Sequence, residues 1–145
     1  MSITRTRKVF VGEDDASGII YFATYFHYMS EGDQLLFEAI GTPVHHQIAD
    51  RAAGPAVHVE CDYVAPARAG DELEHEIRLS AGRRSSYTTT HEFRSGGRVV
   101  ARGRIVRAFV DLDTLRTAPL PAAIRAAADD DTALDVPSNG SRPRS

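Results

Sequence analysis

The chain has 145 residues, of which 42% are hydrophobic and 26% are charged, so it is long enough for one domain with its own core and too short for two of ordinary size. Its formal net charge of −3 at pH 7 provides no overall positive field that would attract nucleic acid or an anionic membrane. The single cysteine excludes an internal disulfide framework and a zinc cage of several cysteines, which favours a cytoplasmic location. No segment approaches the roughly 18–20 consecutive apolar residues of a membrane span, so neither nucleic acid nor a membrane is expected as a partner.

The first expected elements are a strand around residues 5–11 and a long helix that begins near Phe22. Apolar residues recur along the helix at steps of three and four, which is the spacing of one helical face. That face consists of Phe22, Tyr25, Met29, Gly32, Leu36 and Ile40. Gly41 and Pro43 predict the end of the helix, because glycine adopts the left-handed cap and proline cannot continue the hydrogen-bond ladder. Gly32, within the apolar face, predicts that another element closely approaches the helix backbone.

After residue 54 the apolar period changes from 3.6 to 2, which is typical of strands with one buried face. Four such strands are expected, at residues 57–63, 72–79, 87–94 and 99–105. The buried face of the first is expected to consist of Val57, Val59, Cys61 and Tyr63. Short turns between the strands predict an antiparallel meander.

Together with the N-terminal strand, this order predicts an α+β fold in which the long helix packs on a five-stranded antiparallel sheet. An open sheet leaves one edge unpaired, so a dimer that continues the sheet is expected. Residues 126–145 contain three consecutive aspartates, two prolines and few large apolar side chains, so burial would not repay the entropy of ordering them. We therefore expect a single domain over residues 1–125 and a disordered tail over residues 126–145.

The loop before the helix has the densest set of reactive side chains, with the adjacent acids Glu13, Asp14 and Asp15. Loops between a strand and a helix commonly contain reacting groups. The unpaired N–H groups at the helix start, near Phe22, could hold a developing oxyanion, while a carboxylate just upstream attacks a carbonyl or activates water. Alternatively, Asp14, Asp15 and Ser17 cap the helix or form turns. Like-charge repulsion from Glu13 and Asp14 is expected to raise the pKa of Asp15.

The segment from Asp15 to Tyr25, DASGIIYFATY, resembles the signature of the 4-hydroxybenzoyl-CoA thioesterase-like family of hotdog-fold enzymes. The segment from Tyr63 to Leu73, YVAPARAGDEL, is similar to that family's junction between the second and third strands. The likeness extends from about Arg5 to Arg125. It implies a hotdog fold with a long central helix wrapped by the sheet, hydrolysis of an acyl-CoA, and a homodimer or homotetramer with active sites at the dimer interface.

Carried over to this sequence, the resemblance implies that Asp15 is the catalytic aspartate and that the backbone amide of Phe22 donates to the thioester carbonyl. It also implies that Arg83 and Arg84 bind the phosphates of coenzyme A, which suits guanidinium geometry. The remaining substrate-binding residues expected are Gly18, Tyr25 and Ser85. No cofactor is expected, since coenzyme A is part of the substrate.

Several alternatives stay open at this point. The acyl group is either aromatic or short and aliphatic, and an acyl carrier protein could supply the thioester instead of coenzyme A. A non-catalytic acyl-CoA-binding or sensor module is the alternative from another class of protein. The Asp15 motif favours the enzyme, because a binding module gains nothing from a carboxylate beside a thioester carbonyl, where it has a desolvation cost. A metal site is not expected, since the neighbours His45 and His46 diverge by about 100° on a helix.

Overall fold

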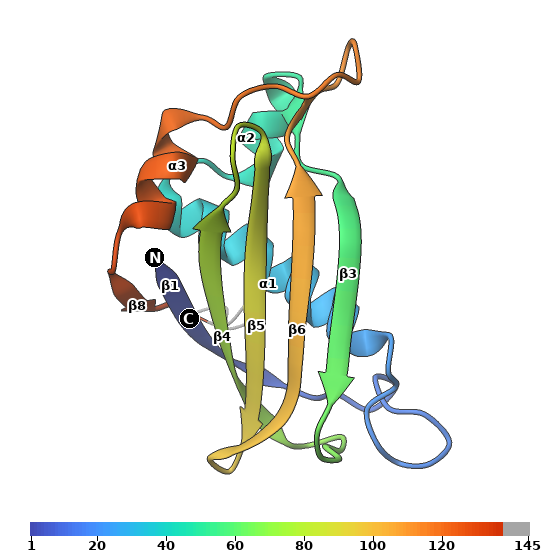
Figure 1. Cartoon of the computed structure of the whole chain (residues 1–145). Coiled ribbons are helices and arrows are strands. Elements are labelled where there is room, and N and C mark those ends of the chain that lie inside the picture. The colour runs from blue at the N-terminus through green and yellow to red at the C-terminus, as the bar shows by residue number, and fades with distance from the viewer. Residues whose placement is uncertain (138–145) are drawn as a thin grey trace, which may run out of the picture.

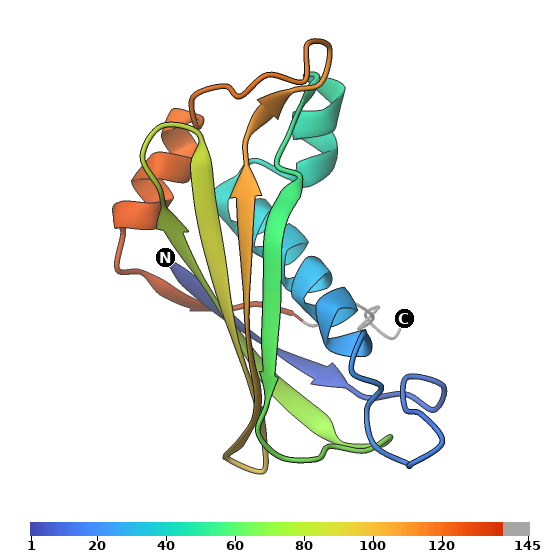
Figure 2. The ribbon, with the colours of Figure 1, turned by 45° about the vertical axis from the view of Figure 1, so that its right-hand side comes forward.

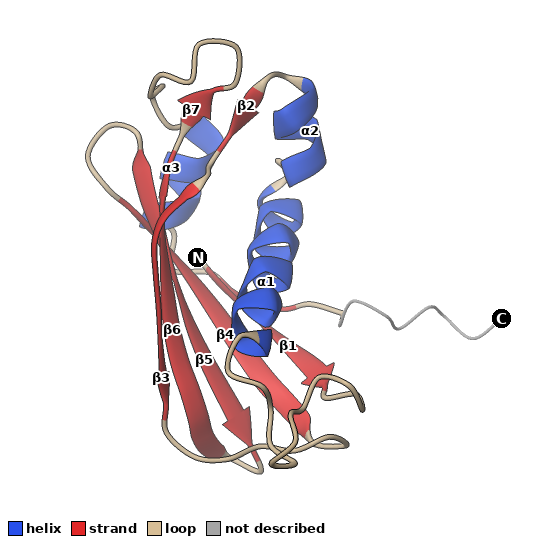
Figure 3. Cartoon of the chain, turned by 90° about the vertical axis from the view of Figure 1, so that its right-hand side faces the viewer, coloured by secondary structure: helices blue, strands red, loops and turns tan. Residues whose placement is uncertain are grey.

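A long helix lies against one face of a large twisted sheet in the computed structural model, which describes residues 1–137 (Figure 1). In chain order the elements are β1 (Ser2–Lys8), α1 (Thr24–Ile40), α2 (Val44–Ala49), β2 (Ala52–Ala53), β3 (Ala56–Tyr63), β4 (Glu72–Ala81), β5 (Ser86–Ser95), β6 (Arg98–Ala108), β7 (Val110–Asp111), α3 (Ala122–Asp129) and β8 (Ala133–Asp135). Figure 3 shows the helix and the sheet as separate layers, with α2 and α3 at one end of the molecule and the loop before α1 at the other. Among the helices of the described residues, none is both long and apolar enough to cross a membrane.

Helix α1 confirms the expected apolar face for most of its length. Its buried residues include Tyr25, Met29, Gly32 and Leu36. Phe22 precedes the first helical residue and is 56% exposed, so it does not belong to the core face. Gly41 ends the helix as predicted, with φ at +90° and its N–H donating to the Glu38 carbonyl over 3.1 Å.

The close approach predicted at Gly32 is made by strand β4. A Cβ atom at this position would lie 2.6 Å from Cε1 of His75 and 2.8 Å from Cγ1 of Ile77. Distances this short require one of the neighbours to move, and both neighbours are fully buried. Glycine at position 32 therefore allows the sheet to curve tightly around α1.

Replacing Gly32 with alanine is expected to destabilise the protein by about 1–3 kcal/mol through overpacking, even though alanine favours an isolated helix by about 1 kcal/mol. The free energy of unfolding in urea measures this difference. Gln34→Ala, at an exposed position of the same helix, is the matched control and should change it by less than about 0.5 kcal/mol. Equal stabilities of wild type and Gly32→Ala would show that His75 and Ile77 adjust freely.

The main sheet has the strand order β3-β6-β5-β4-β1-β8. The first five strands are antiparallel, as predicted, and β8 is added in parallel beside β1. The short strands β2 and β7 form a separate antiparallel pair near α2. This architecture is the hotdog arrangement expected from the sequence, with α1 lying across the concave face of the sheet (Figure 2).

The predicted buried face of β3 is wrong for a single chain. Val57 is 64% exposed, Val59 is 41% exposed and Tyr63 is 48% exposed, while Cys61 is half-buried. The reason is position in the sheet: β3 pairs only with β6, and no element of the described residues covers its other edge. The alternation therefore predicts the strand correctly but not its burial within one chain.

The C-terminal expectation was also wrong over part of its range. Helix α3 continues to Asp129, and β8 pairs with β1. Ile124 and Ala127 of α3 pack into the core beside Leu36, and Val136 donates its N–H to the Thr4 carbonyl over 2.9 Å. Pairing with an exposed sheet edge supplies backbone hydrogen bonds that composition does not reveal. The rest of the expected tail, residues 138–145, lies outside the described residues.

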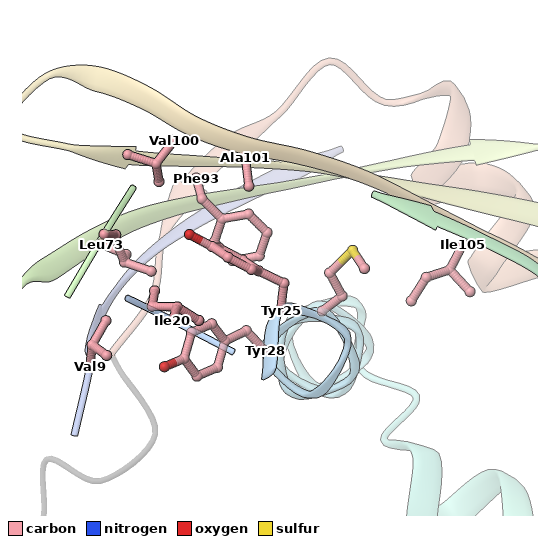
Figure 4. Packing of buried hydrophobic residues seen from close by; sticks show 11 residues of the cluster. Val9, Ile20, Tyr25, Tyr28, Leu73, Phe93, Val100, Ala101 and Ile105 are labelled. Atoms are coloured by element: carbon pink, nitrogen blue, oxygen red, sulfur yellow. The ribbon is translucent and has the colours of Figure 1, made fainter. Parts of the chain in front are cut away.

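The core consists of two clusters between α1 and the sheet. Figure 4 shows the cluster near the start of α1, where the Tyr25 ring lies against Phe93 of β5 and the Tyr28 ring lies beside Ile20. The ring centroids of Tyr25 and Tyr28 lie 5.1 Å and 6.3 Å from that of Phe93. The second cluster joins the end of α1 to α3 around Phe37 and Tyr87. Tyr25 and Tyr28 are therefore primarily core residues.

A chain of buried polar groups lies between the two clusters. Arg5 Nε donates to Nδ1 of His75 over 3.1 Å, and Nε2 of His75 lies 2.8 Å from Nδ1 of His91. Because arginine can only donate, His75 accepts through Nδ1 and carries its proton on Nε2. Nε2 of His91 lies 3.2 Å from Asp33 Oδ1, and Asp33 Oδ2 accepts from Arg107 over 3.0 Å. Burial, together with the nearby His91 and Arg5, holds the pKa of His75 well below its ordinary value.

Candidate active site

The loop between β1 and α1 folds back on itself like a small hairpin. The Tyr21 N–H donates to the Glu13 carbonyl over 3.1 Å, and the Asp15 N–H donates to the Ile19 carbonyl over 2.9 Å. Gly18 closes the turn with φ at +80° and donates its N–H to the Asp15 carbonyl over 3.0 Å. A positive φ of this kind favours glycine, so Gly18 shapes the turn that presents Asp15.

The Asp15 carboxylate is exposed at the tip of this hairpin. Its Oδ1 accepts the Ser17 N–H over 2.8 Å and also the Ser17 hydroxyl, while Oδ2 has no hydrogen-bond partner among residues 1–137. The Ser17 hydroxyl, and after it the Ser17 N–H, lower the pKa of Asp15. Asp15 is thus ionised at neutral pH, which a nucleophile or general base requires.

The expected rise in the pKa of Asp15 was wrong in direction. The carboxylate of Glu13 forms a bidentate ion pair with Arg7, at 3.1 Å and 2.8 Å, which offsets its charge. The Asp14 carboxylate turns back to accept the Gly12 N–H over 3.1 Å in an exposed position. Neither acid therefore raises the pKa of Asp15 as their nearness in sequence suggested.

Replacing Ser17 with alanine is expected to raise the pKa of Asp15 toward its ordinary value of 3.8, because the largest stabilisation of the carboxylate is removed. The residue 17 N–H remains, so the rise is partial. The ¹³C shift of the Asp15 carboxyl carbon across an NMR titration measures this pKa directly. Ser80→Ala, far along the sheet in β4, is the control. An unchanged Asp15 pKa in Ser17→Ala would contradict the turn geometry.

The start of α1 leaves backbone donors unpaired. The helix begins after Ala23, with no side-chain cap and no acidic residue in its first turn, so the alternative in which the loop acids cap the helix is wrong. The Phe22 N–H has no acceptor within the described part of the chain, whereas the Phe22 carbonyl accepts the Tyr63 hydroxyl over 2.9 Å. Tyr63 thereby holds the peptide that follows Phe22, and an unpaired N–H at a helix start is a donor that an anion or a carbonyl oxygen could accept.

Asp15, Phe22 and Tyr25 line one cavity of about 480 Å³. The other lining residues are Ile19, Ile20, Tyr63, Val64, Ala65, Pro66 and Ala67. The walls are mainly apolar, and Asp15 contributes the one ionised group among the lining residues. A carboxylate in such a cavity can attack a carbonyl, or activate water to do so, and a free N–H can stabilise the oxyanion that forms.

The sequence prediction missed the wall formed by Tyr63 and the turn after it. The YVAPARAGDEL segment, which is similar to the family's strand junction, contains this wall, so its likeness is the signal that could have indicated it. Tyr63 also packs against Tyr25, with ring centroids 5.7 Å apart. It therefore joins β3 to the helix start at the cavity.

Arg83, Arg84 and Ser85 do not lie near Asp15 in one chain. They form the β4–β5 turn, whereas the Asp15 loop follows the end of β1 that pairs with the start of β4. The length of β4, at about 3.3 Å per residue, separates the two places by about 30 Å. Both arginine side chains are exposed, and the carbonyls of this turn accept hydrogen bonds from Arg125. Contact with a ligand in the Asp15 cavity would require a second copy of the chain.

No group of three or more His, Cys, Asp or Glu side chains is placed to hold a metal ion in the part of the chain that the structure describes. Burial raises the pKa of the Cys61 thiol to about 11, which keeps it protonated at neutral pH and unsuited to nucleophilic attack.

A family model described as the thioesterase-like superfamily matches residues 9–128. The chain is 27% identical, over 82% of its length and 89% of the relative's, to a 1,4-dihydroxy-2-naphthoyl-CoA hydrolase of Synechococcus elongatus. Among solved structures, it resembles a 1,4-dihydroxy-2-naphthoyl-CoA thioesterase from Synechocystis, with a TM-score of 0.85, 22% identity, and coverage of 90% of this chain and 98% of that one. A gentisyl-coenzyme A thioesterase superposes with a TM-score of 0.79 at 25% identity, covering 86% of this chain and 98% of that one.

Proposed function

Because the chain belongs to the thioesterase-like superfamily and is a thioester hydrolase, we propose that it hydrolyses an aromatic acyl-CoA to the free acid and coenzyme A. The observation that carries this proposal is that Asp15 and Phe22 line the same largely apolar cavity. The relatives named above act on hydroxylated aromatic acyl groups, and Phe22, Tyr25 and Tyr63 give this cavity aromatic walls. A cavity of about 480 Å³ has room for a ring system of that kind.

In the proposed reaction the thioester carbonyl accepts a hydrogen bond from the Phe22 N–H at the positive end of the α1 dipole. This contact strengthens as negative charge develops on the oxygen. Asp15 then acts in one of two ways. As a nucleophile, it attacks the carbonyl carbon, the C–S bond breaks, the coenzyme A thiolate leaves, and water cleaves the resulting mixed anhydride. As a general base, it takes a proton from the water that attacks the thioester directly.

We further propose that the active assembly is a homodimer, or a tetramer built from such dimers, in which two β3 strands pair. The unpaired edge of β3 carries the exposed Val57 and Val59, and a second copy would cover them. Antiparallel pairing about a two-fold axis would set the Asp15 end of one sheet beside the β4–β5 turn of the other. Arg83 and Arg84 from the second copy would then be available to the coenzyme A phosphates. Ser85, in the same turn, would lie beside them.

The experiment that tests the function is release of free thiol from a panel of benzoyl-, hydroxybenzoyl-, dihydroxynaphthoyl-, phenylacetyl-, short-chain and long-chain acyl-CoA substrates. We expect kcat/KM to be highest for a hydroxylated aromatic substrate, at least about 10-fold above acetyl-CoA, because the aliphatic group leaves the aromatic walls unfilled. A preference for short aliphatic chains would overturn the aromatic assignment. If thiol were released only from an acylated acyl carrier protein, the substrate would be the carrier-bound thioester and not an acyl-CoA. Tight binding without any release would favour the sensor module, provided that light scattering shows a folded dimer.

A further inference from the structure

The Glu13 carboxylate accepts several hydrogen bonds, although the proposed reaction gives this residue no role. Its carboxylate accepts two hydrogen bonds from Arg7, at 3.1 Å and 2.8 Å, one from the Phe10 N–H at 2.8 Å, and one from the Tyr28 hydroxyl at 3.0 Å. These donors come from β1, from the first turn of the loop and from α1. The Glu13 side chain thus ties three separate pieces of chain together two residues before Asp15.

The backbone carbonyl of Glu13 also forms hydrogen bonds, and these connect it to the start of α1. Its carbonyl accepts the Tyr21 N–H over 3.1 Å and the Thr24 hydroxyl over 3.0 Å. Tyr21 immediately precedes the Phe22 N–H. The opposite arm of the hairpin carries Asp15, which is held by its own bond to the Ile19 carbonyl. These bonds connect Glu13 both to the arm that carries Asp15 and to the residue before Phe22.

The loop between β1 and α1 has few apolar contacts that could fix its position in place of these hydrogen bonds. Val11 is 90% exposed and Phe10 is 57% exposed, and Ile20 is the buried apolar side chain of residues 10–22. Figure 4 shows Ile20 beside Tyr28, on the side where the loop meets the helix, and Figure 2 shows the loop projecting from the foot of α1. With so little packing, its position depends on polar anchors.

Arg7 is itself fixed, which makes it a rigid anchor for Glu13. Its Nε donates to Glu31 Oε1 of α1 over 3.0 Å, and its guanidinium stacks over the Tyr28 ring at 4.7 Å from the centroid. Burial acts to lower the pKa of Arg7, but the hydrogen bonds to Glu31 and Glu13 outweigh burial and raise it. The arginine is therefore charged at every working pH and its geometry favours a carboxylate over an amide at position 13.

We propose that Glu13 is a positioning residue, which holds the Asp15 hairpin in register with the Phe22 N–H through Arg7 and Tyr28. The inference rests on the proposed role of Asp15. It assigns to Glu13 no contact with the substrate. Loss of the carboxylate would leave Asp15 chemically intact but misplaced, and even a displacement of about 1 Å can lower the rate of a positioned reaction about 100-fold.

The test compares Glu13→Gln with wild type on the best substrate of the panel. Glutamine keeps the size and can still accept from the Phe10 N–H and the Tyr28 hydroxyl, but it loses the charge-assisted pair with Arg7. We expect kcat to fall about 10–100-fold with KM changed by less than about 3-fold. Tyr28→Phe removes one hydrogen bond to Glu13 and should lower kcat about 2–5-fold. This variant therefore tests the role of Glu13 if Glu13→Gln does not fold. Glu92→Gln, which removes a glutamate paired with Arg94 and Arg102 on the outer face of the sheet, is the matched control and should retain wild-type kcat.

A double-mutant cycle distinguishes positioning of Asp15 from general support of the fold. If Glu13 acts through Asp15, its replacement should have little further effect in the Asp15→Asn background, because the group that it positions is gone. The same fold-loss in both backgrounds would overturn the inference. So would wild-type kcat in Glu13→Gln together with a large loss in Asp15→Asn, an outcome that leaves the proposed function intact. If Asp15→Asn itself retained full activity, the proposed function would fail first.

Discussion

Replacing Asp15 with asparagine is expected to lower kcat by about 10²–10⁴-fold, with a much smaller change in KM. Asparagine has the same shape and can still accept the Ser17 N–H that now binds Oδ1 at 2.8 Å, so the hairpin should keep its geometry. What it loses is the negative oxygen that attacks the carbonyl or takes a proton from water. The Phe22 N–H remains, so residual turnover above the uncatalysed rate is expected. Thiol-release kinetics on the best aromatic substrate measure both constants.

Asp14→Asn is the matched control for this experiment. Asp14 lies next to Asp15, but its Oδ1 accepts the Gly12 N–H over 3.1 Å, a bond that asparagine can also accept, and it does not line the cavity. We expect kcat within about 2-fold of wild type. Full activity in Asp15→Asn would reduce Asp15 to a turn residue, and comparable losses in both variants would point to the overall charge of the loop rather than to one carboxylate.

Replacing Arg5 with methionine is expected to lower the free energy of unfolding by about 3 kcal/mol, because it breaks a buried ionic network by removing one partner. Arg5 is 1% exposed. Its guanidinium donates to His75 Nδ1 at 3.1 Å, to the Tyr28 carbonyl at 2.9 Å and to Glu31 Oε1 at 3.0 Å. Methionine fills similar space but donates to none of these acceptors. Glu31 keeps its bond to Arg7, which limits the loss.

Urea unfolding followed by circular dichroism measures this change, and the melting temperature should fall by about 10 °C. The control is Arg78→Met. Arg78 pairs with Glu76 at 3.1 Å on the exposed face of β4, with side chains 63% and 46% exposed, and a surface pair of this kind is worth at most about 1 kcal/mol. Equal stability of Arg5→Met and wild type would mean that the desolvation cost of the network cancels its attraction.

Several features of the protein follow from local sequence patterns. The apolar period of 3.6 and Gly41 predicted helix α1 and its end, and the period of 2 predicted the strands β4 and β5. These predictions succeed because periodicity and chain reversal depend on residues close together in sequence. The Asp15–Tyr25 motif likewise indicated both the family and the loop in which the cavity is found, since its residues are contiguous.

Other features depended on segments that are far apart in the chain. The charge of Glu13 is offset by Arg7 of β1, so Glu13 does not raise the pKa of Asp15 as its nearness in sequence suggested. The acceptors of Arg5 lie on α1 and β4, so its burial left no mark in the local pattern. Burial, charge pairing and pKa are set by what packs around a group, and a one-dimensional pattern does not contain those neighbours.

The edges of the sheet show most clearly the difference between what local sequence determines and what packing of distant segments determines. The alternation of Val57 and Val59 correctly predicted a strand, but its place beside β6 alone leaves both side chains exposed in one chain. The segment after residue 125 has few large apolar side chains, yet the free edge of β1 orders Ala133–Asp135 as β8. Similarly, Arg83 and Arg84 are separated from Asp15 by the full length of β4. Sequence determined which segments form the five antiparallel strands and which loop holds the Asp15 carboxylate. Strand order in the tertiary structure decided which edges, charges and side chains meet, because pairing between distant segments is a property of the packed whole.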